Sequence, residues 1–294
     1  MSDAQRLTLL LAAALAACLA ACSDPESPSA KGNSRQDSPA SEAAEPSTEH
    51  THDFWIEPSA GAHRTGEVID IGLRVGTAFE DRPVRRDERK FARFVVLGPE
   101  GVETVSGEDG KAPAGRFTPK RDGIHVVAYE GRSHQIERAA PTFETTLRDE
   151  GLDAVAKMRA DRGETGRPGR ETWSRCAKSL VLVGAAAADG FDRVAGLRLE
   201  IVPETNPFVA APGAETTFRV LFEGRPLEGA LVAARRRAEP KPAVSARTAA
   251  DGRVTLKLDA AGAWLVRCTH MVPAPPASGM DWESLWASFT LVFP

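Results

Sequence analysis

The stretch IDIGLRV, residues 69–75, decides the fold class, because its apolar residues occupy every second position. This period of two is typical of a β-strand with one buried face. Turn signals rich in Gly and Pro separate it from further short strands, an arrangement typical of a β-sandwich. These further strands are expected at residues 91–97, 124–129, 180–183, 197–202, 216–222, 254–258 and 262–266. The pattern predicts a mostly β chain with two β-sandwich domains, Ig-like or prealbumin-like in type.

A short helical insertion is expected near residues 141–162. Thr142 suits the N-cap position, and the apolar residues that follow it recur at helical spacing. Gly151 lies in the middle of this pattern and is predicted to kink or split the helix.

The insertion belongs to the first sandwich, which we place at residues 52–203, and the second sandwich follows at residues 204–294. The second contains the segment GRPLEGALV, residues 224–232, and then the turn pair Asp251-Gly252, which predicts a hairpin. This order resembles the carboxypeptidase-regulatory or transthyretin-like sandwich over residues 212–270. The resemblance implies a fold and a binding role, and no activity.

The N-terminus indicates an export signal that ends in a lipid-attachment motif. The apolar run that begins at Leu7 is shorter than the roughly 20 residues of a membrane-spanning helix. It ends LAAC at residues 19–22, which resembles the bacterial lipobox, so Cys22 is the expected lipidation site. A second match to the lipobox ends at Cys18. The alternative to lipidation is an ordinary cleaved signal, in which the cysteine is incidental. Ser23 favours the outer membrane, so we expect an outer-membrane lipoprotein that faces the periplasm.

A disordered tether is expected at residues 23–51, between the signal peptide of residues 1–22 and the first sandwich. The tether contains no Val, Ile, Leu, Met, Phe, Trp or Tyr. Such a composition buries too little apolar surface to offset the entropy of ordering. The lipid on Cys22 makes the membrane one expected partner, and a transport or envelope protein is the other.

The composition excludes several classes of protein. The chain has 37 Lys and Arg against 41 Asp and Glu, a net charge of −4, which does not favour nucleic-acid binding. Its 6 His and 4 Cys are too few for a dense zinc array or a disulfide scaffold. The patterns H-E-x-x-H, G-x-S-x-G, G-x-G-x-x-G and the P-loop are absent from the sequence, so we expect no enzymatic activity.

The segment HDFWIEP, residues 52–58, resembles the opening of a bacterial envelope family catalogued as a domain of unknown function. That family was once labelled a nickel-uptake (NikM-like) component, and the resemblance implies a secreted, β-rich protein linked to nickel or cobalt uptake. One departure is that residues 23–51 separate His52 from Cys22, so His52 has no free amino terminus beside it. Further matching segments lie at residues 74–76, 127–129, 143–152, 169–171, 174–178, 270–272 and 281–288.

Candidate metal ligands lie at both ends of the matching region. His50 and His52 are two positions apart, so their rings lie on one side of an extended chain, and nickel favours imidazole nitrogen. We expect His52 and His270 as the main ligands of a nickel or cobalt site, with His50, Asp281 and Glu283 in support. The alternative for the His pair is a solvated end of the tether. No cofactor is certain.

Two cysteines, Cys176 and Cys268, remain after signal removal and lipidation. In an oxidising envelope they are candidates for a disulfide. Two buried free thiols, or a metal site formed by cysteine and histidine, are the alternatives that the sequence leaves open.

Trp282 and Trp286 fall on one face of either a strand or a helix. They form a candidate stacking face for a sugar, an aromatic group or a cation. The alternative is packing against the loop at residues 273–276.

The expected function is a lipid-anchored periplasmic binding protein that handles a divalent metal as an accessory to uptake. The alternative function is a non-metal structural or glycan- or protein-binding module of the envelope.

Overall fold

The computed structural model describes residues 53–77, 80–185, 189–211, 213–237, 244–258 and 261–293. The chain divides after Glu45, and every described residue belongs to the second unit, Pro46–Pro294. The predicted signal peptide, lipobox and tether therefore lie outside the described residues. No helix within the described ranges is long and apolar enough to span a bilayer.

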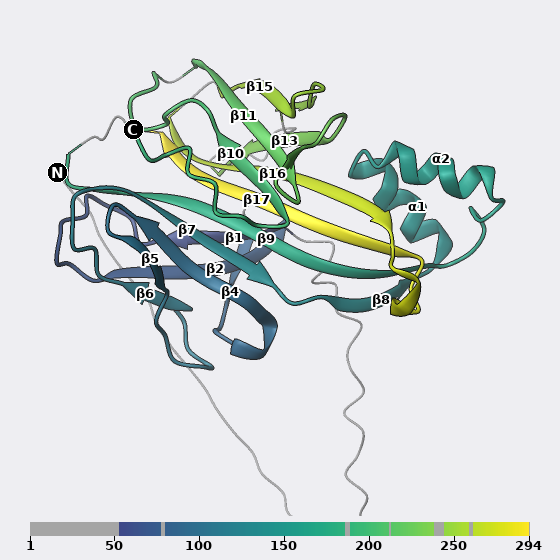
Figure 1. Cartoon of the computed structure of the whole chain (residues 1–294), viewed down its shortest axis with the longest axis horizontal. Coiled ribbons are helices and arrows are strands. Elements are labelled where there is room, and N and C mark those ends of the chain that lie inside the picture. The colour runs from purple at the N-terminus through teal and green to yellow at the C-terminus, as the bar shows by residue number, and fades with distance from the viewer. Residues whose placement is uncertain are drawn as a thin grey trace, which may run out of the picture. The chain divides into compact units, whose positions relative to one another are not determined.

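The centre of the second unit is a sheet of nine strands (Figure 1). Neighbouring strands are antiparallel except β9 and β17, which run parallel. A ninth strand, β8 (His134–Arg138), pairs with one end of β9. The order of the others is β14 (Val244–Arg247), β13 (Leu231–Arg236), β16 (Gly262–Pro273), β17 (Trp282–Phe293), β9 (Gly169–Val183), β7 (Gly123–Gly131), β4 (Phe91–Gly98) and β5 (Gly101–Thr104).

Two four-stranded sheets make up the rest of the sheet structure in the described residues. The N-terminal sheet contains β1 (Asp53–Pro58), β2 (Ile69–Thr77), β3 (Glu80–Val84) and β6 (Gly115–Phe117). The C-terminal sheet contains β10 (Leu199–Pro203), β11 (Glu215–Phe222), β12 (Arg225–Pro226) and β15 (Arg253–Lys257). Short 3-10 turns lie at Glu88–Lys90 and Pro276–Ser278.

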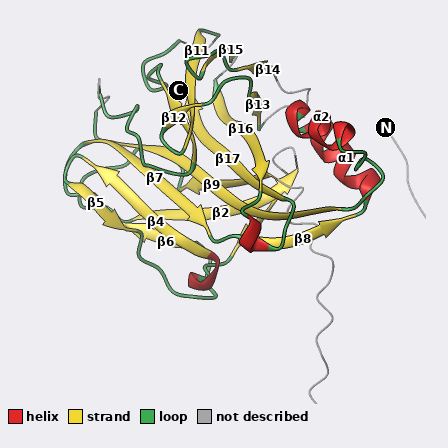
Figure 2. Ribbon diagram, turned by 45° about the vertical axis from the view of Figure 1, so that its right-hand side comes forward, coloured by secondary structure: helices red, strands yellow, loops and turns green. Residues whose placement is uncertain are grey.

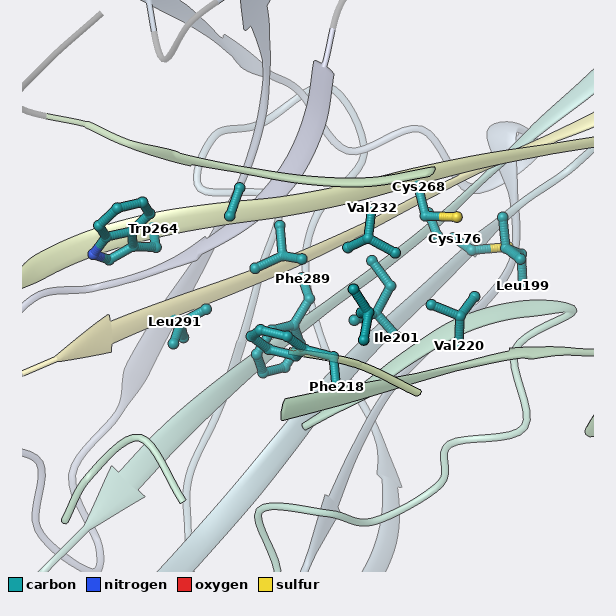
Figure 3. Packing of buried hydrophobic residues seen from close by; sticks show 14 of the residues in the cluster. Cys176, Leu199, Ile201, Phe218, Val220, Val232, Trp264, Cys268, Phe289 and Leu291 are labelled. Carbon is teal, nitrogen blue, oxygen red and sulfur yellow. The ribbon is translucent and has the colours of Figure 1, made fainter. Parts of the chain in front are cut away.

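The two small sheets cover opposite faces of the large one, and β9 serves both cores. Ala177 and Val181 of β9 pack with the N-terminal sheet. Cys176 and Leu180 pack with the C-terminal sheet, in the core where Phe289 of β17 meets Phe218 of β11 with 6.1 Å between ring centroids (Figure 3). Because successive side chains of a strand point to opposite faces, one strand contributes to both cores.

The mostly β fold with a short helical insertion is confirmed, and the two sandwiches share one sheet. The boundary that we placed between residues 203 and 204 falls between β10 and β11, which pair with each other along Leu199–Pro203. Strand periodicity shows which residues are buried, but not which sheet covers them.

The helical insertion consists of α1 (Ala140–Asp149) and α2 (Asp153–Asp161), which lie together beside the sheet (Figure 2). Gly151 separates them with φ of +64°, so the predicted split is confirmed. The helices pack over the large sheet through a small apolar cluster of their own. That cluster consists of Phe143, Leu147, Leu152, Val155, Met271 and Trp282.

The hairpin predicted at Asp251-Gly252 is wrong, although the turn itself is present. Gly252 has φ of +77°, but the strands on either side of the turn belong to different sheets. β14 pairs with β13, whereas β15 pairs with β11. A Cβ on Gly252 would lie 2.7 Å from the carbonyl oxygen of Val220, so this glycine allows the turn to cross between layers against β11.

Candidate functional site

A large hollow lies where the two parallel strands of the central sheet separate. β9 and β17 pair from Glu171 and Trp282 as far as Ser179 and Thr290. Each strand then continues beside its other neighbour alone, β9 along β7 and β17 along β16. The divergence toward the C-terminal ends is visible in Figure 1. We call this opening the fork.

A cleft of about 1060 Å³ occupies the fork. Leu180, Leu182 and Val292 line it from the two diverging strands. Leu73 and Val84 line it from the N-terminal sheet, and Phe208, from the loop after β10, lines it as well. The volume reaches the upper end of the range of about 300–1,000 Å³ that is typical of ligand pockets.

The charged groups at the cleft are already paired. Glu57 lies 2.6 Å from Arg74 and also contacts Arg237. Deeper in the cleft, the backbone carbonyl of Thr290 accepts a hydrogen bond of 3.1 Å from the Ser179 hydroxyl. The Thr290 hydroxyl is buried and has no hydrogen-bond partner among the described residues. The cleft therefore offers a largely apolar lining with few polar groups.

The described members of the predicted metal site, His270, Asp281 and Glu283, form no metal-binding group. Asp281 accepts two hydrogen bonds from Arg170, of 2.7 and 3.0 Å, which lower the pKa of the Asp281 carboxyl. Glu283 accepts two from Arg198, of 2.7 and 3.2 Å. Both carboxylates are thus held by arginine, and the described residues contain no group of three or more His, Cys, Asp or Glu suited to a metal ion.

His270 packs edge-on against Phe222, with 4.6 Å between ring centroids, and burial lowers its pKa. It lies on the face of β16 that meets the C-terminal sheet. Arg267, which contacts Asp53 at 3.5 Å, points from the opposite face. His50, His52 and Cys22 lie outside the described residues, so the expected pairing of His52 with His270 stays a prediction.

Cys176 and Cys268 are free and buried. Each is the register partner of Ala287, so β17 lies between them. Two strand spacings amount to about 9.5 Å, and a disulfide needs Cα atoms within about 7 Å. The disulfide is therefore not formed in this structure, and burial raises the pKa of both thiols to about 12.

The two tryptophans have different environments. Trp282 is fully buried beneath the helices, and it is the register partner of Pro273, the first residue of the loop that we considered as its packing partner. Trp286 is half-buried, and its indole nitrogen donates to the Ser284 hydroxyl at 3.0 Å. Trp286 forms one wall of a shallow hollow of about 400 Å³ beside α1, so at most one ring of the predicted stacking face is accessible.

The comparisons with known proteins identify a family without an assigned function. Residues 50–272 match the family described as Domain of unknown function (DUF4198). The chain belongs to the DUF4198 family. No curated protein matches the chain.

Solved structures similar to this DUF4198 chain include the ligand-binding domain of human OSCAR and the D0-D1 domain of intimin. The OSCAR domain is 18% identical, with 82% of this chain and 99% of that chain covered and a TM-score of 0.20. The intimin domain is 12% identical, with 82% and 98% covered and a TM-score of 0.21.

The DUF4198 match ends before β17, which forms one wall of the fork. The sequence patterns place several cleft residues on strands but assign none of them to a binding site. The end of the chain, SFTLVFP at residues 288–294, carries an apolar strand signal that could have suggested another strand. No pattern in it indicates that this strand would separate from β9.

Proposed function

We propose that this DUF4198 chain is a non-catalytic binding protein and that the fork cleft is its ligand site. The observation that carries the proposal is the coincidence of an opened sheet with a large, apolar cleft between its diverging strands. Pockets of this size and lining, with a few polar groups, are the usual sites of ligand binding. The absence of catalytic motifs from the sequence agrees with a binding role.

The proposed setting is the cell envelope, with the lipid on Cys22 as anchor and the tether as spacer. This setting rests on the lipobox at residues 19–22 and on the composition of residues 23–51. A tethered binding protein of this kind would capture its ligand near the membrane or present it to a second envelope protein.

Handling of nickel or cobalt stays a prediction that depends on His50 and His52. The described ligand candidates give it little support, because arginines hold both Asp281 and Glu283. We therefore rank binding at the fork above metal handling.

The experiment measures binding of the apolar fluorophore 1-anilinonaphthalene-8-sulfonate (ANS) to the full chain. Val292 lines the cleft but is 56% exposed, so Val292→Glu places a charge in the cleft without a folding penalty from burial. We expect ANS fluorescence to rise with the wild type and its affinity to fall at least about tenfold with Val292→Glu, since a carboxylate disfavours an apolar, anionic probe.

The matched control is Val102→Glu, because Val102 is an exposed strand valine, on β5, that does not line the cleft; it is 68% exposed against 56% for Val292. We expect Val102→Glu to bind ANS like the wild type. Equal ANS binding by both variants, or no ANS binding by the wild type, would overturn the proposal.

A further inference from the structure

The backbone of β17 is open toward the fork. The amide of Arg237 donates to the carbonyl of Ala263 at 3.0 Å, so the backbone groups of Ala263 face β13. Along an antiparallel strand these directions alternate. The backbone groups of Gly262 and Trp264 therefore face β17, where these two residues pair with Phe293 and Leu291.

It follows that the backbone groups of Val292 face away from β16 and into the fork. The Thr290 carbonyl, two residues earlier, has the same direction, because it accepts from Ser179 of β9. At Val292 the ladder with β9 has already ended. The amide and carbonyl of Val292 thus have no strand partner on that side among the described residues.

Beyond its last pair with β17 at Ser179, β9 has no strand of the central sheet on the side of the fork among the described residues. At its end the amide of Gly184 donates to the carbonyl of His63 at 2.9 Å, and His63 forms an isolated bridge with Val183. Between this bridge and the last pair at Ser179, β9 has β7 as its neighbour on one side and the cleft on the other.

We infer that the occupant of the fork is an extended peptide segment, added as a strand against Val292 with alternate apolar side chains in the cleft. The inference rests on the proposed function and names its ligand class. An exposed strand edge is a template for a further strand, in which backbone hydrogen bonds supply affinity and side-chain pockets supply specificity.

The charge pattern favours a peptide over a lipid or another ligand with a charged head group. Glu57 is engaged by both Arg74 and Arg237, so the ion pairs at the cleft are already formed within the chain. The open groups on β17 are instead the amide and carbonyl of Val292. Both are uncharged and can form hydrogen bonds with the backbone of another segment. The opened part of the fork, Leu291–Phe293 opposite Leu180–Leu182, suits a peptide with about three residues in contact.

The experiment is displacement of ANS from the full chain by a pool of blocked hexapeptides in which Val, Ile, Leu or Phe alternates with Thr. A second pool carries N-methyl groups on alternate amides, which keeps the side chains and removes the donors. We expect the first pool to displace ANS and the second to do so about three- to tenfold less well for each hydrogen bond lost.

A pair of variants tests the same backbone from the side of the protein. Val292→Pro removes the amide hydrogen that faces the fork and leaves the pairing of Leu291 and Phe293 with β16 in place. Val292→Ala removes the branched methyl groups and keeps the amide. We expect peptide affinity to fall about three- to tenfold further in Val292→Pro than in Val292→Ala.

The outcomes separate the two proposals. If ANS binds and neither pool displaces it, or both pools displace it equally, the peptide inference is overturned and the cleft remains a ligand site. If wild-type ANS binding is absent, the proposed function itself fails. If Val292→Pro loses ANS binding as well, the comparison of the methylated and unmethylated pools on the wild type decides whether the peptide inference stands.

Discussion

At the scale of single residues, the interior of the C-terminal sandwich contains a complete ion pair. The ammonium of Lys178 on β9 lies 2.5 Å from a carboxylate oxygen of Glu200 on β10, and both side chains are buried. Glu200 also accepts from the amides of Ala195, Gly196 and Leu197 at 2.7–3.1 Å. The carboxylate therefore holds the loop before β10 against the central sheet.

We predict that Glu200→Ala destabilises the fold by about 3–5 kcal/mol, because it leaves a buried ammonium uncompensated and three amides without their acceptor. Urea unfolding followed by tryptophan fluorescence measures the loss. Asp281→Ala is the control, because Asp281 accepts two hydrogen bonds from Arg170 in a half-exposed pair that contributes at most about 1 kcal/mol. Similar losses in the two variants would contradict the role given to burial.

The same contrast explains why local spacing alone is a weak guide to metal ligands. Asp281 and Glu283 are acidic residues beside tryptophans, which is all that local spacing reveals. Their partners, Arg170 and Arg198, are 111 and 85 positions away and meet them through the fold. Whether a carboxylate is free to bind a metal depends on such distant partners, so spacing alone does not decide it.

At the scale of elements, the junction between the helices depends on the conformation of one glycine. Gly151 has φ of +64°, and a Cβ added there would lie 2.8 Å from the Cβ of Leu231 on β13. The junction is also held by Arg247, which donates to the carbonyl of Gly151 and pairs with Asp153 at 2.6 Å. The helical insertion is thereby fixed to the edge of the central sheet.

We predict that Gly151→Ala destabilises the fold by about 2–4 kcal/mol, the sum of a left-handed backbone penalty and a steric one. Gly163→Ala is the matched control, because Gly163 has φ of +66° and open space around its Cα, and it should cost about 1–2 kcal/mol. Thermal and urea unfolding measure both. Equal costs would mean that contact with Leu231 adds nothing.

Elements with local signals were predictable, and their partners were not. The split at Gly151 and the strand at residues 69–75 follow from residue type and period. The Asp251-Gly252 turn also formed where expected, but the strands on its two sides belong to different sheets. β14 pairs with β13, and β15 pairs with β11. Turn chemistry specifies a reversal of the chain and leaves the choice of neighbour to packing.

At the scale of the whole molecule, the fork follows from two cores built on one sheet. β9 contributes residues to both cores, whereas β17 contributes Phe289 and Leu291 to the C-terminal core. Past Ser179 and Thr290, β9 stays with β7 and β17 stays with β16. The strands separate, and the cleft forms between the halves of the sheet. This consequence of topology has no local pattern in the sequence.

The predicted position of the protein in the cell depends on Cys22. We predict that a Gram-negative host attaches lipid at Cys22, so that Cys22→Ser releases the protein into the soluble periplasmic fraction. A diacylglycerol plus an amide-linked chain anchors stably, whereas a chain without acyl groups has only its tether to contact the bilayer. Metabolic labelling with palmitate and fractionation of membranes measure the change.

Cys18→Ser is the control that assigns the site, because Cys18 ends the competing LAAC match four residues upstream. We expect this variant to keep both the label and the membrane fraction. Loss of label in Cys18→Ser but not in Cys22→Ser would move the anchor to Cys18 and lengthen the tether by four residues. An unlabelled wild type would indicate an ordinary cleaved signal, and the proposed binding unit would then act as a freely diffusing periplasmic protein, able to carry its ligand away from the membrane.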